Sequence, residues 1–111
     1  VPYKVFKDLE ELGFGDWQGR SAKNIGQKIV NQFKVDPINN RPPNAEKLHD
    51  FQQRVLTTFN EIVNAKNDYQ SVLIIAHAGV IRVIKSHLLN LPIEKMFTIE
   101  IMSGSCERFE L

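Results

Sequence analysis

The segment 71–82, SVLIIAHAGVIR, constrains the fold of this chain more than any other stretch of the sequence. Its first six residues are almost entirely apolar, a pattern typical of an internal strand of a parallel sheet that helices cover on both faces. A histidine and two small residues follow, and the next apolar residues predict a helix over 79–90 that ends before Pro92. The segment therefore predicts a strand-to-helix junction with His77 at the turn.

Alternating helical and strand-like segments along the rest of the chain predict an α/β fold. Apolar residues at helical spacing indicate a helix over 22–34 that Ser21 caps and a longer helix over 45–67 that Asn44 caps. The expected strands are 1–6, 71–76, 97–101 and 106–111, with a turn at 103–105. We expect one domain over 1–111, built in three layers with a mostly parallel sheet between helices.

Composition and charge exclude several classes of function. The chain has 14 basic and 13 acidic residues, and a net charge of +1 gives no footprint for nucleic acid or a membrane surface. The longest apolar run, 72–76, is too short to cross a bilayer. The single cysteine, Cys106, is typical of a reducing compartment such as the cytoplasm, and we expect it to be a buried structural thiol. No group of side chains has the spacing of a metal site.

The junction at His77 is suited to binding an anion. Ligands of open α/β sheets lie beyond the carboxyl ends of the strands. The N–H groups of Ala78 and Gly79 would open the helix, and its dipole favours negative charge there. An imidazolium would add a charge-assisted hydrogen bond to a phosphate. A histidine that only bonds a carbonyl group and helps to end the strand explains the segment equally well.

The loop DLEELGFGDWQG, residues 8–19, gathers four acidic residues around three glycines. A carboxyl group held near a bound phosphate would have a raised pKa because of like charge and burial. Such a group could donate a proton to a leaving oxygen. Taken alone, the loop also fits a plain surface loop with scattered acids.

The other polar candidates carry weaker signals. His49 falls on the polar face of its expected helix, where we expect it to be solvated, and His87 is expected to pack rather than react. Arg54 and Arg82 could pair with Glu46 or reach an anion, and a structural ion pair is the simpler interpretation.

Taken together and in this order, three stretches resemble the histidine phosphatase superfamily, which has the phosphoglycerate-mutase-like fold. LEELGFGDWQG resembles the loop of that family that carries a Glu, PPNAEKLHDFQQRV resembles its Pro-x-x-Glu entry to a long helix, and VLIIAHAGVIR resembles its second-histidine motif. The forms PNAE and FGDWQG are most similar to those of α-ribazole phosphatases, which remove a 5′-phosphate in cobalamin synthesis.

The resemblance implies a phosphatase that works through a phosphohistidine intermediate, with no metal and no cofactor. It implies that Glu11 protonates the leaving alcohol, that His77 is the second catalytic histidine, and that the backbone of Ala78 and Gly79 lies at the phosphate. Three further residues match family positions without an assigned chemical step and are expected to be structural or supporting: Glu46, Arg54 and Arg82.

The sequence departs from the family pattern in one respect. The nucleophile of that family is the histidine of an Arg-His-Gly motif, and no such motif occurs here. The sequence also opens without Met, so we expect an incomplete domain that lacks its first strand and is inactive alone. The expected ligands are a small phosphate ester or free phosphate, and the expected partner is the missing segment or another copy of the chain. A non-catalytic phosphate-binding or regulatory module and a purely structural fragment remain alternatives.

Overall fold

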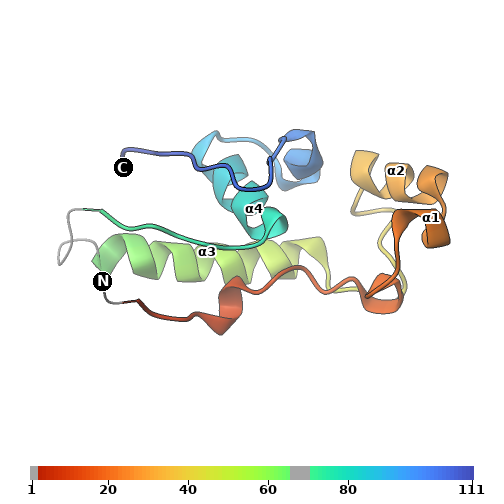
Figure 1. Cartoon of the computed structure of the whole chain (residues 1–111), viewed down its shortest axis with the longest axis horizontal. Coiled ribbons are helices and arrows are strands. Elements are labelled where there is room, and N and C mark those ends of the chain that lie inside the picture. Colours follow the sequence, from red (N-terminus) through yellow and green to blue (C-terminus); the bar gives the residue numbers. More distant parts are fainter. Residues whose placement is uncertain (1–2, 66–70) are drawn as a thin grey trace.

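The computed structural model describes residues 3–65 and 71–111, and within them the regular secondary structure is entirely helical. The α-helices are α1 (Ala22–Ile25), α2 (Gln27–Val35), α3 (Leu48–Asn64) and α4 (Ala78–Leu88). The short 3-10 helices are η1 (Lys7–Leu9), η2 (Gly15–Trp17) and η4 (Ile93–Thr98). The chain is elongated, 46 × 26 × 25 Å, with α1 and α2 at one end of it (Figure 1).

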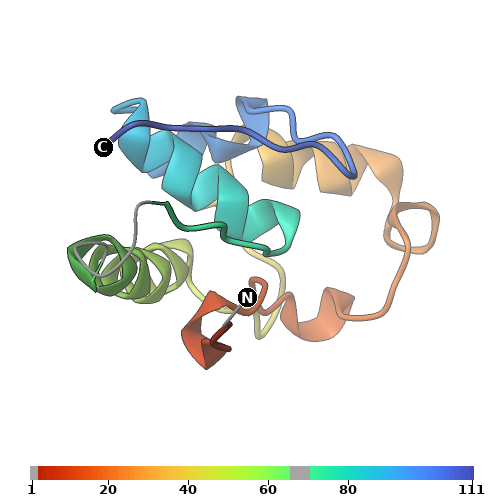
Figure 2. The same cartoon turned by 60° about the vertical axis from the view of Figure 1, so that its left-hand side comes forward.

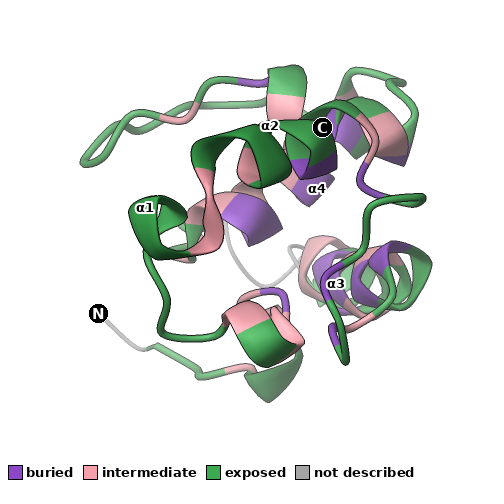
Figure 3. Ribbon diagram, turned by 90° about the vertical axis from the view of Figure 1, so that its right-hand side faces the viewer, coloured by how far each residue is buried: buried purple, intermediate pink, exposed green. Residues whose placement is uncertain are grey.

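The core forms where α4 and η4 pack over α3. The predicted apolar face of α3 is confirmed, because Phe51 and Val55 are wholly buried. Val80 on α4 and Met96 on η4 are equally buried, and the buried residues of these helices face the inside of the molecule (Figure 3). Burial of each such side chain contributes about 1.5–3 kcal/mol. This small core holds α4 firmly against α3.

The predicted helix 22–34 is confirmed at its start but divided within. The Oγ atom of Ser21 accepts a hydrogen bond from Asn24 N–H at 3.1 Å, as expected of a cap. Gly26, with a φ of 114°, separates α1 from α2, because only glycine adopts this conformation without strain. Phe33 then anchors α2 among aromatic rings 5.1 to 6.3 Å away between centroids: Phe97, Trp17 and Phe14.

The predicted start of the long helix at residue 45 is wrong. Helix α3 begins at Leu48, after Lys47, so neither Asn44 nor Glu46 belongs to it. Asn44 has a φ of 61°, the left-handed conformation that asparagine tolerates, and its side chain donates to Asp16 at 3.0 Å. The end predicted at residue 67 lies outside the described residues.

The expected three-layer parallel sheet is wrong, because residues 3–65 and 71–111 contain no strand. The segment 71–77 leads along α3 into α4 without helical structure (Figures 1 and 2). Ile74 and Ala76 pack against the core, whereas Leu73 and Ile75 are 73% and 88% exposed. A strand requires a neighbour with which it exchanges backbone hydrogen bonds, and no described segment pairs with this one. The segment is apolar on both faces, but the core covers only the face that carries Ile74 and Ala76.

The other expected strands are wrong for the residues that the structure describes. Helix η4 takes up the first two residues of 97–101, and neither 3–6 nor 106–111 forms a strand. The predicted turn at 103–105 is confirmed, since Ser105 N–H donates to the carbonyl of Met102 at 3.0 Å. Cys106 is exposed, so the prediction of a buried thiol is wrong. None of the helices in the described part of the chain combines the length and apolar character that a membrane span requires.

Candidate active site

The Glu11 carboxylate lies at the N-terminus of α4. One of its oxygens, Oε2, accepts a hydrogen bond from the Gly79 N–H at 3.0 Å, and Oε1 accepts one from the N–H of Leu12 at 2.9 Å. The first N–H groups of a helix have no partner within the helix, and the helix dipole favours a negative charge beside them. The sequence assigned this position to a bound anion, and the structure brings the side chain of Glu11 to it.

Gly79 is required at this contact because a larger residue would displace the carboxylate. A Cβ atom on Gly79 would overlap with Oε1 of Glu11 and would lie 2.9 Å from its Cδ and 3.1 Å from Oε2. Gly79 is itself buried at the start of α4. Gly79 thus admits the carboxylate against the helix, which is a more specific role than the close backbone approach to a ligand that the sequence predicted.

His77 is the residue that immediately precedes α4. Its backbone is extended, with φ −68° and ψ 160°, and its carbonyl accepts a hydrogen bond from Ile81 N–H at 3.2 Å. The residue is exposed, and Ala78 next to it is half-buried. The predicted junction is therefore confirmed as a turn into a helix, although no strand precedes it, and it brings His77 within two residues of the Glu11 contact.

Glu46 and Arg54 form an ion pair behind the Glu11 loop. Arg54 donates from Nε to Oε2 of Glu46 at 2.8 Å and from Nη2 to Oε1 at 2.9 Å. The hydrogen bond from Arg54 lowers the pKa of Glu46 against the opposing effect of burial, and Gly13 N–H adds to the lowering. The same bond to Glu46 raises the pKa of Arg54. The structural ion pair expected for these two residues is confirmed.

Arg82 does not join this group. Its Nε donates to the carbonyl of Ile99 at 3.0 Å, and its guanidinium lies 5.8 Å from the centroid of the Phe97 ring. It therefore ties α4 to the segment that follows η4. His49 is exposed, as expected, and His87 is exposed while its ring contacts Phe59 at 6.3 Å.

The sequence does not indicate how the Glu11 loop is joined to the loop that precedes α3. Gly13 and Glu46 exchange backbone and side-chain hydrogen bonds, and Asp16 N–H donates to the carbonyl of Pro43 at 2.9 Å. Gly15, with a φ of 57°, is pressed against this second loop, so that a Cβ atom there would overlap with backbone atoms of residues 43–45. Two sequence features could have pointed to this contact: the three glycines of the first loop and the Pro-Pro-Asn stretch of the second. Both are typical of turns with unusual backbone conformations.

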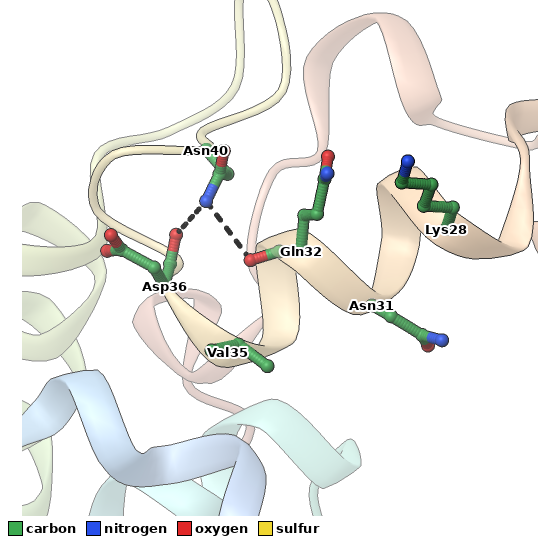
Figure 4. A pocket seen from close by; sticks show the side chains of 6 residues that line it. All are labelled: Lys28, Asn31, Gln32, Val35, Asp36 and Asn40. Atoms are coloured by element: carbon green, nitrogen blue, oxygen red, sulfur yellow. Dashed lines mark hydrogen bonds between the residues drawn. The ribbon is translucent and has the colours of Figure 1, made fainter.

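A hollow of about 550 Å³ lies elsewhere in the described structure, formed by α2 and the turn after it (Figure 4). The amide of Asn40 spans this turn by donating to the carbonyls of Gln32 and Asp36 at 3.1 and 3.0 Å. None of the candidate site residues lines it. A second hollow of about 360 Å³ borders the Arg54 side chain. No group of acidic, His and Cys side chains in the described residues could hold a metal ion.

Comparison with known proteins gives the family. A model of the histidine phosphatase superfamily (branch 1) matches residues 1–111. The chain belongs to this superfamily. The resemblance of the three sequence stretches is thereby confirmed, and of the residues that carry it, the structure brings Glu11 and Gly79 into contact at the start of α4.

Several known proteins are similar to this chain. The adenosylcobalamin/α-ribazole phosphatase of Escherichia coli (strain K12) is 27% identical over 107 residues, which are 94% of this chain and 52% of that protein. A 2,3-bisphosphoglycerate-dependent phosphoglycerate mutase of Gloeothece citriformis (strain PCC 7424) is 31% identical over 109 residues, 94% of this chain and 46% of that protein. The crystal structure of the α-ribazole phosphatase from Shigella flexneri matches with a TM-score of 0.73 and 28% identity, covering 94% of this chain and 52% of that one. The chain thus spans about half the length of these relatives.

Proposed function

We propose that this chain contributes the proton-donor side of a phosphomonoesterase site, with Glu11 as the acid and His77 beside the phosphoryl group. The observation that supports the proposal is the contact of the Glu11 carboxylate with Gly79 N–H, two residues from His77. A histidine phosphatase needs an acid and an imidazole around one phosphate, and Glu11 contacts the end of α4 that His77 immediately precedes.

The proposed reaction has two steps. A nucleophilic histidine attacks phosphorus, the bond from phosphorus to the leaving oxygen breaks, and Glu11 gives its proton to that oxygen. Water then attacks the phosphohistidine, the bond from phosphorus to nitrogen breaks, and Glu11 takes a proton from the water. In both steps the His77 side chain and the N–H of Ala78 stabilise the charge on the phosphoryl oxygens, since Gly79 N–H is bonded to Glu11.

The nucleophile is not one of the remaining histidines of this sequence. His87 follows Gly79 by eight residues on the same helix, which separates their backbones by about 12 Å along the axis. His49 is on the exposed face of α3. Since the sequence holds no Arg-His-Gly motif, we propose that the nucleophile comes from a segment outside the printed sequence. Another copy of the chain cannot supply a motif that the sequence lacks.

We propose a small phosphate ester as the substrate, with α-ribazole 5′-phosphate as the specific candidate. The support comes from relatives that carry this activity in their names, in Escherichia coli and Salmonella typhimurium, and from the matching crystal structure. Action in the cytoplasm, and residues 1–111 as part of a single domain, remain predictions.

A non-catalytic phosphate-binding module is the second candidate. The observation that favours it is the absence of the nucleophile motif from the sequence, while Glu11, His77 and Gly79 are all present. In that case the start of α4 would bind phosphate and report its presence without turnover.

The test is hydrolysis of an aryl phosphate by the 111-residue chain and by a longer form that also contains the residues encoded upstream of Val1 in the gene. We expect hydrolysis only from the longer form, and its loss in Glu11→Gln and His77→Gln but not in His49→Gln. Turnover by the 111-residue chain that persists in its His77→Gln variant would contradict the proposal.

Binding of inorganic phosphate, followed by the imidazole NMR signals of His77, separates the two candidates. Phosphate-dependent shifts without turnover in either form would favour the binding module. If neither turnover nor a shift at His77 is found, both functions are wrong for this chain.

A further inference from the structure

The guanidinium of Arg54 reaches the backbone of the Glu11 loop as well as Glu46. From Nη1 it donates to the carbonyls of Asp8 and Glu10 at 2.7 and 2.8 Å, and from Nη2 to the carbonyl of Glu11 at 3.0 Å. Together with the two bonds to Glu46, these contacts occupy donors on all three guanidinium nitrogens. Arg54 comes from the second turn of α3, so the loop is fixed to the longest helix of the described structure.

Glu46 holds the other flank of the same loop. Its Oε1 accepts a hydrogen bond from Gly13 N–H at 3.2 Å, and its own N–H donates to the carbonyl of Gly13 at 2.8 Å. Arg54 therefore fixes the backbone up to Glu11, and Glu46 fixes it two residues later. The side chains of this pair are only 21% and 22% exposed, and water competes less for their partly buried bonds to each other, to Gly13 and to the Glu11 carbonyl than for the exposed bonds to Asp8 and Glu10.

We propose that the Glu46–Arg54 pair is a positioning device for the Glu11 carboxylate. Because the loop backbone is held on both sides of Glu11, only the few side-chain torsions of Glu11 remain free, and its carboxylate is directed at Gly79 N–H. The catalytic meaning of this inference rests on the proposed function, whereas the placement itself does not. A preorganised acid loses less entropy when substrate binds and keeps its distance to the leaving oxygen.

Lysine cannot replace Arg54 in this role. Its ammonium keeps the positive charge but has no planar fork, so it cannot bond Glu46 twice and three loop carbonyls at once. The variant Arg54→Lys thus keeps the positive charge but loses the paired hydrogen bonds of the guanidinium, whereas Glu46→Gln keeps the shape of the side chain but loses its negative charge. A matched control is Lys85→Gln, which breaks the ion pair between Lys85 on α4 and Glu107 without touching the loop.

The measurement is the amide signal of Gly79 in the full chain, by NMR. As one of the first N–H groups of α4, this amide has no partner within the helix, so its protection and its pH-dependent shift report the Glu11 carboxylate. We expect Arg54→Lys and Glu46→Gln to speed hydrogen exchange at Gly79 by about tenfold and to shrink its titration. The amide of Val83, inside α4, should change little, and Lys85→Gln should leave Gly79 unaltered.

Two outcomes would overturn the positioning role. If Gly79 keeps its protection and titration in both variants, the pair is a structural contact only. If Gly79 and Val83 lose protection together, the pair stabilises the whole fold instead of directing one side chain. In a form that hydrolyses an aryl phosphate, we expect Arg54→Lys to lower kcat with little change in KM. Absence of turnover in every form, with the Gly79 response as expected, would reject the proposed function and leave the positioning role standing.

Discussion

Substituting Gly79 with alanine isolates the contact on which the site depends. The added Cβ would overlap with Oε1 of Glu11 and approach its Cδ to 2.9 Å, so the carboxylate has to leave the start of α4. Gly79 has no positive φ, and its backbone therefore accepts alanine without strain. The substitution removes one interaction while leaving the helix free to form.

The expected change in stability is small because two effects oppose each other. Loss of the charge-assisted hydrogen bond at this partly exposed helix end costs about 1 kcal/mol. Replacing a helical glycine with alanine returns up to about 1 kcal/mol. The free energy of unfolding should therefore change by less than about 1 kcal/mol, which for a chain of this size corresponds to a shift in Tm below about 8 °C.

Urea unfolding followed by circular dichroism gives the stability, and a pH titration of the amide at position 79 gives the position of Glu11. We expect near-normal stability together with loss of the carboxylate-dependent shift. Gly13→Ala is the matched control, because a Cβ there would lie 3.5 Å from Cβ of Glu46, an ordinary contact. A Gly79→Ala variant whose amide still follows Glu11, or one that loses more than about 3 kcal/mol, would show that the reasoning is wrong.

Three further predictions concern the surroundings of the site. Because Arg54 lowers the pKa of Glu46, the pair contributes stability above the pKa of a free Glu carboxyl, about 4.3, and that stability is lost as the pH falls through the lowered pKa. The acid side of the pH–stability curve, measured by thermal unfolding, should therefore flatten in Glu46→Gln. An unchanged curve would contradict the pair's contribution. Gly15→Ala should cost more than about 2 kcal/mol in urea unfolding, since both its φ of 57° and neighbouring backbone oppose a Cβ, whereas Gly104→Ala, with a φ of 76° and nothing within 4 Å, should cost only about 1 kcal/mol. Ile74→Ala should cost about 1–2 kcal/mol and Ile75→Ala less than about 0.5 kcal/mol, and equal losses would mean that both faces of this segment are covered.

The helices could be predicted because helical signals are local. The buried face of α3 repeats every three to four residues, and Ser21 and Pro92 stand at helix boundaries as their chemistry suggests. Asn44 misled the prediction because the same side chain that caps helices also tolerates the left-handed conformation. Here it adopts that conformation and bonds Asp16.

The strands could not be predicted because strand formation is not local. The composition of 71–76 favours extended backbone, but a strand exists only where a second segment offers its N–H and C=O groups. Likewise, the alternation of residues 97–101 is compatible with the 3-10 helix η4, which buries Met96 and leaves Ile99 buried just beyond its end. Hydrophobic pattern alone does not distinguish these outcomes over five or six residues.

The residues of the candidate site were named from the sequence, but most of the contacts between them were not predicted. Glu11 and Gly79 were expected near one anion, but the sequence, in which they are 68 positions apart, gave no sign that they would contact each other directly. The ion pair of Glu46 and Arg54 was expected, whereas its hold on three loop carbonyls was not. Side chains that bond backbone groups leave no residue-type pattern in the partner segment, since every residue offers a carbonyl.

These contacts give the two halves of the site different degrees of order. Glu11 is held through Arg54, through Glu46 and by α4, so its carboxylate is preorganised before any ligand arrives. His77 has its backbone fixed by α4, but the residue is exposed, and the segment before it packs on one side only. If phosphate binds here as proposed, it would therefore order the imidazole more than the carboxylate. The entropy lost on binding would then come mainly from ordering the His77 side chain. A segment that covered the outer face of 71–76 would reduce this loss by ordering the backbone before His77 in advance.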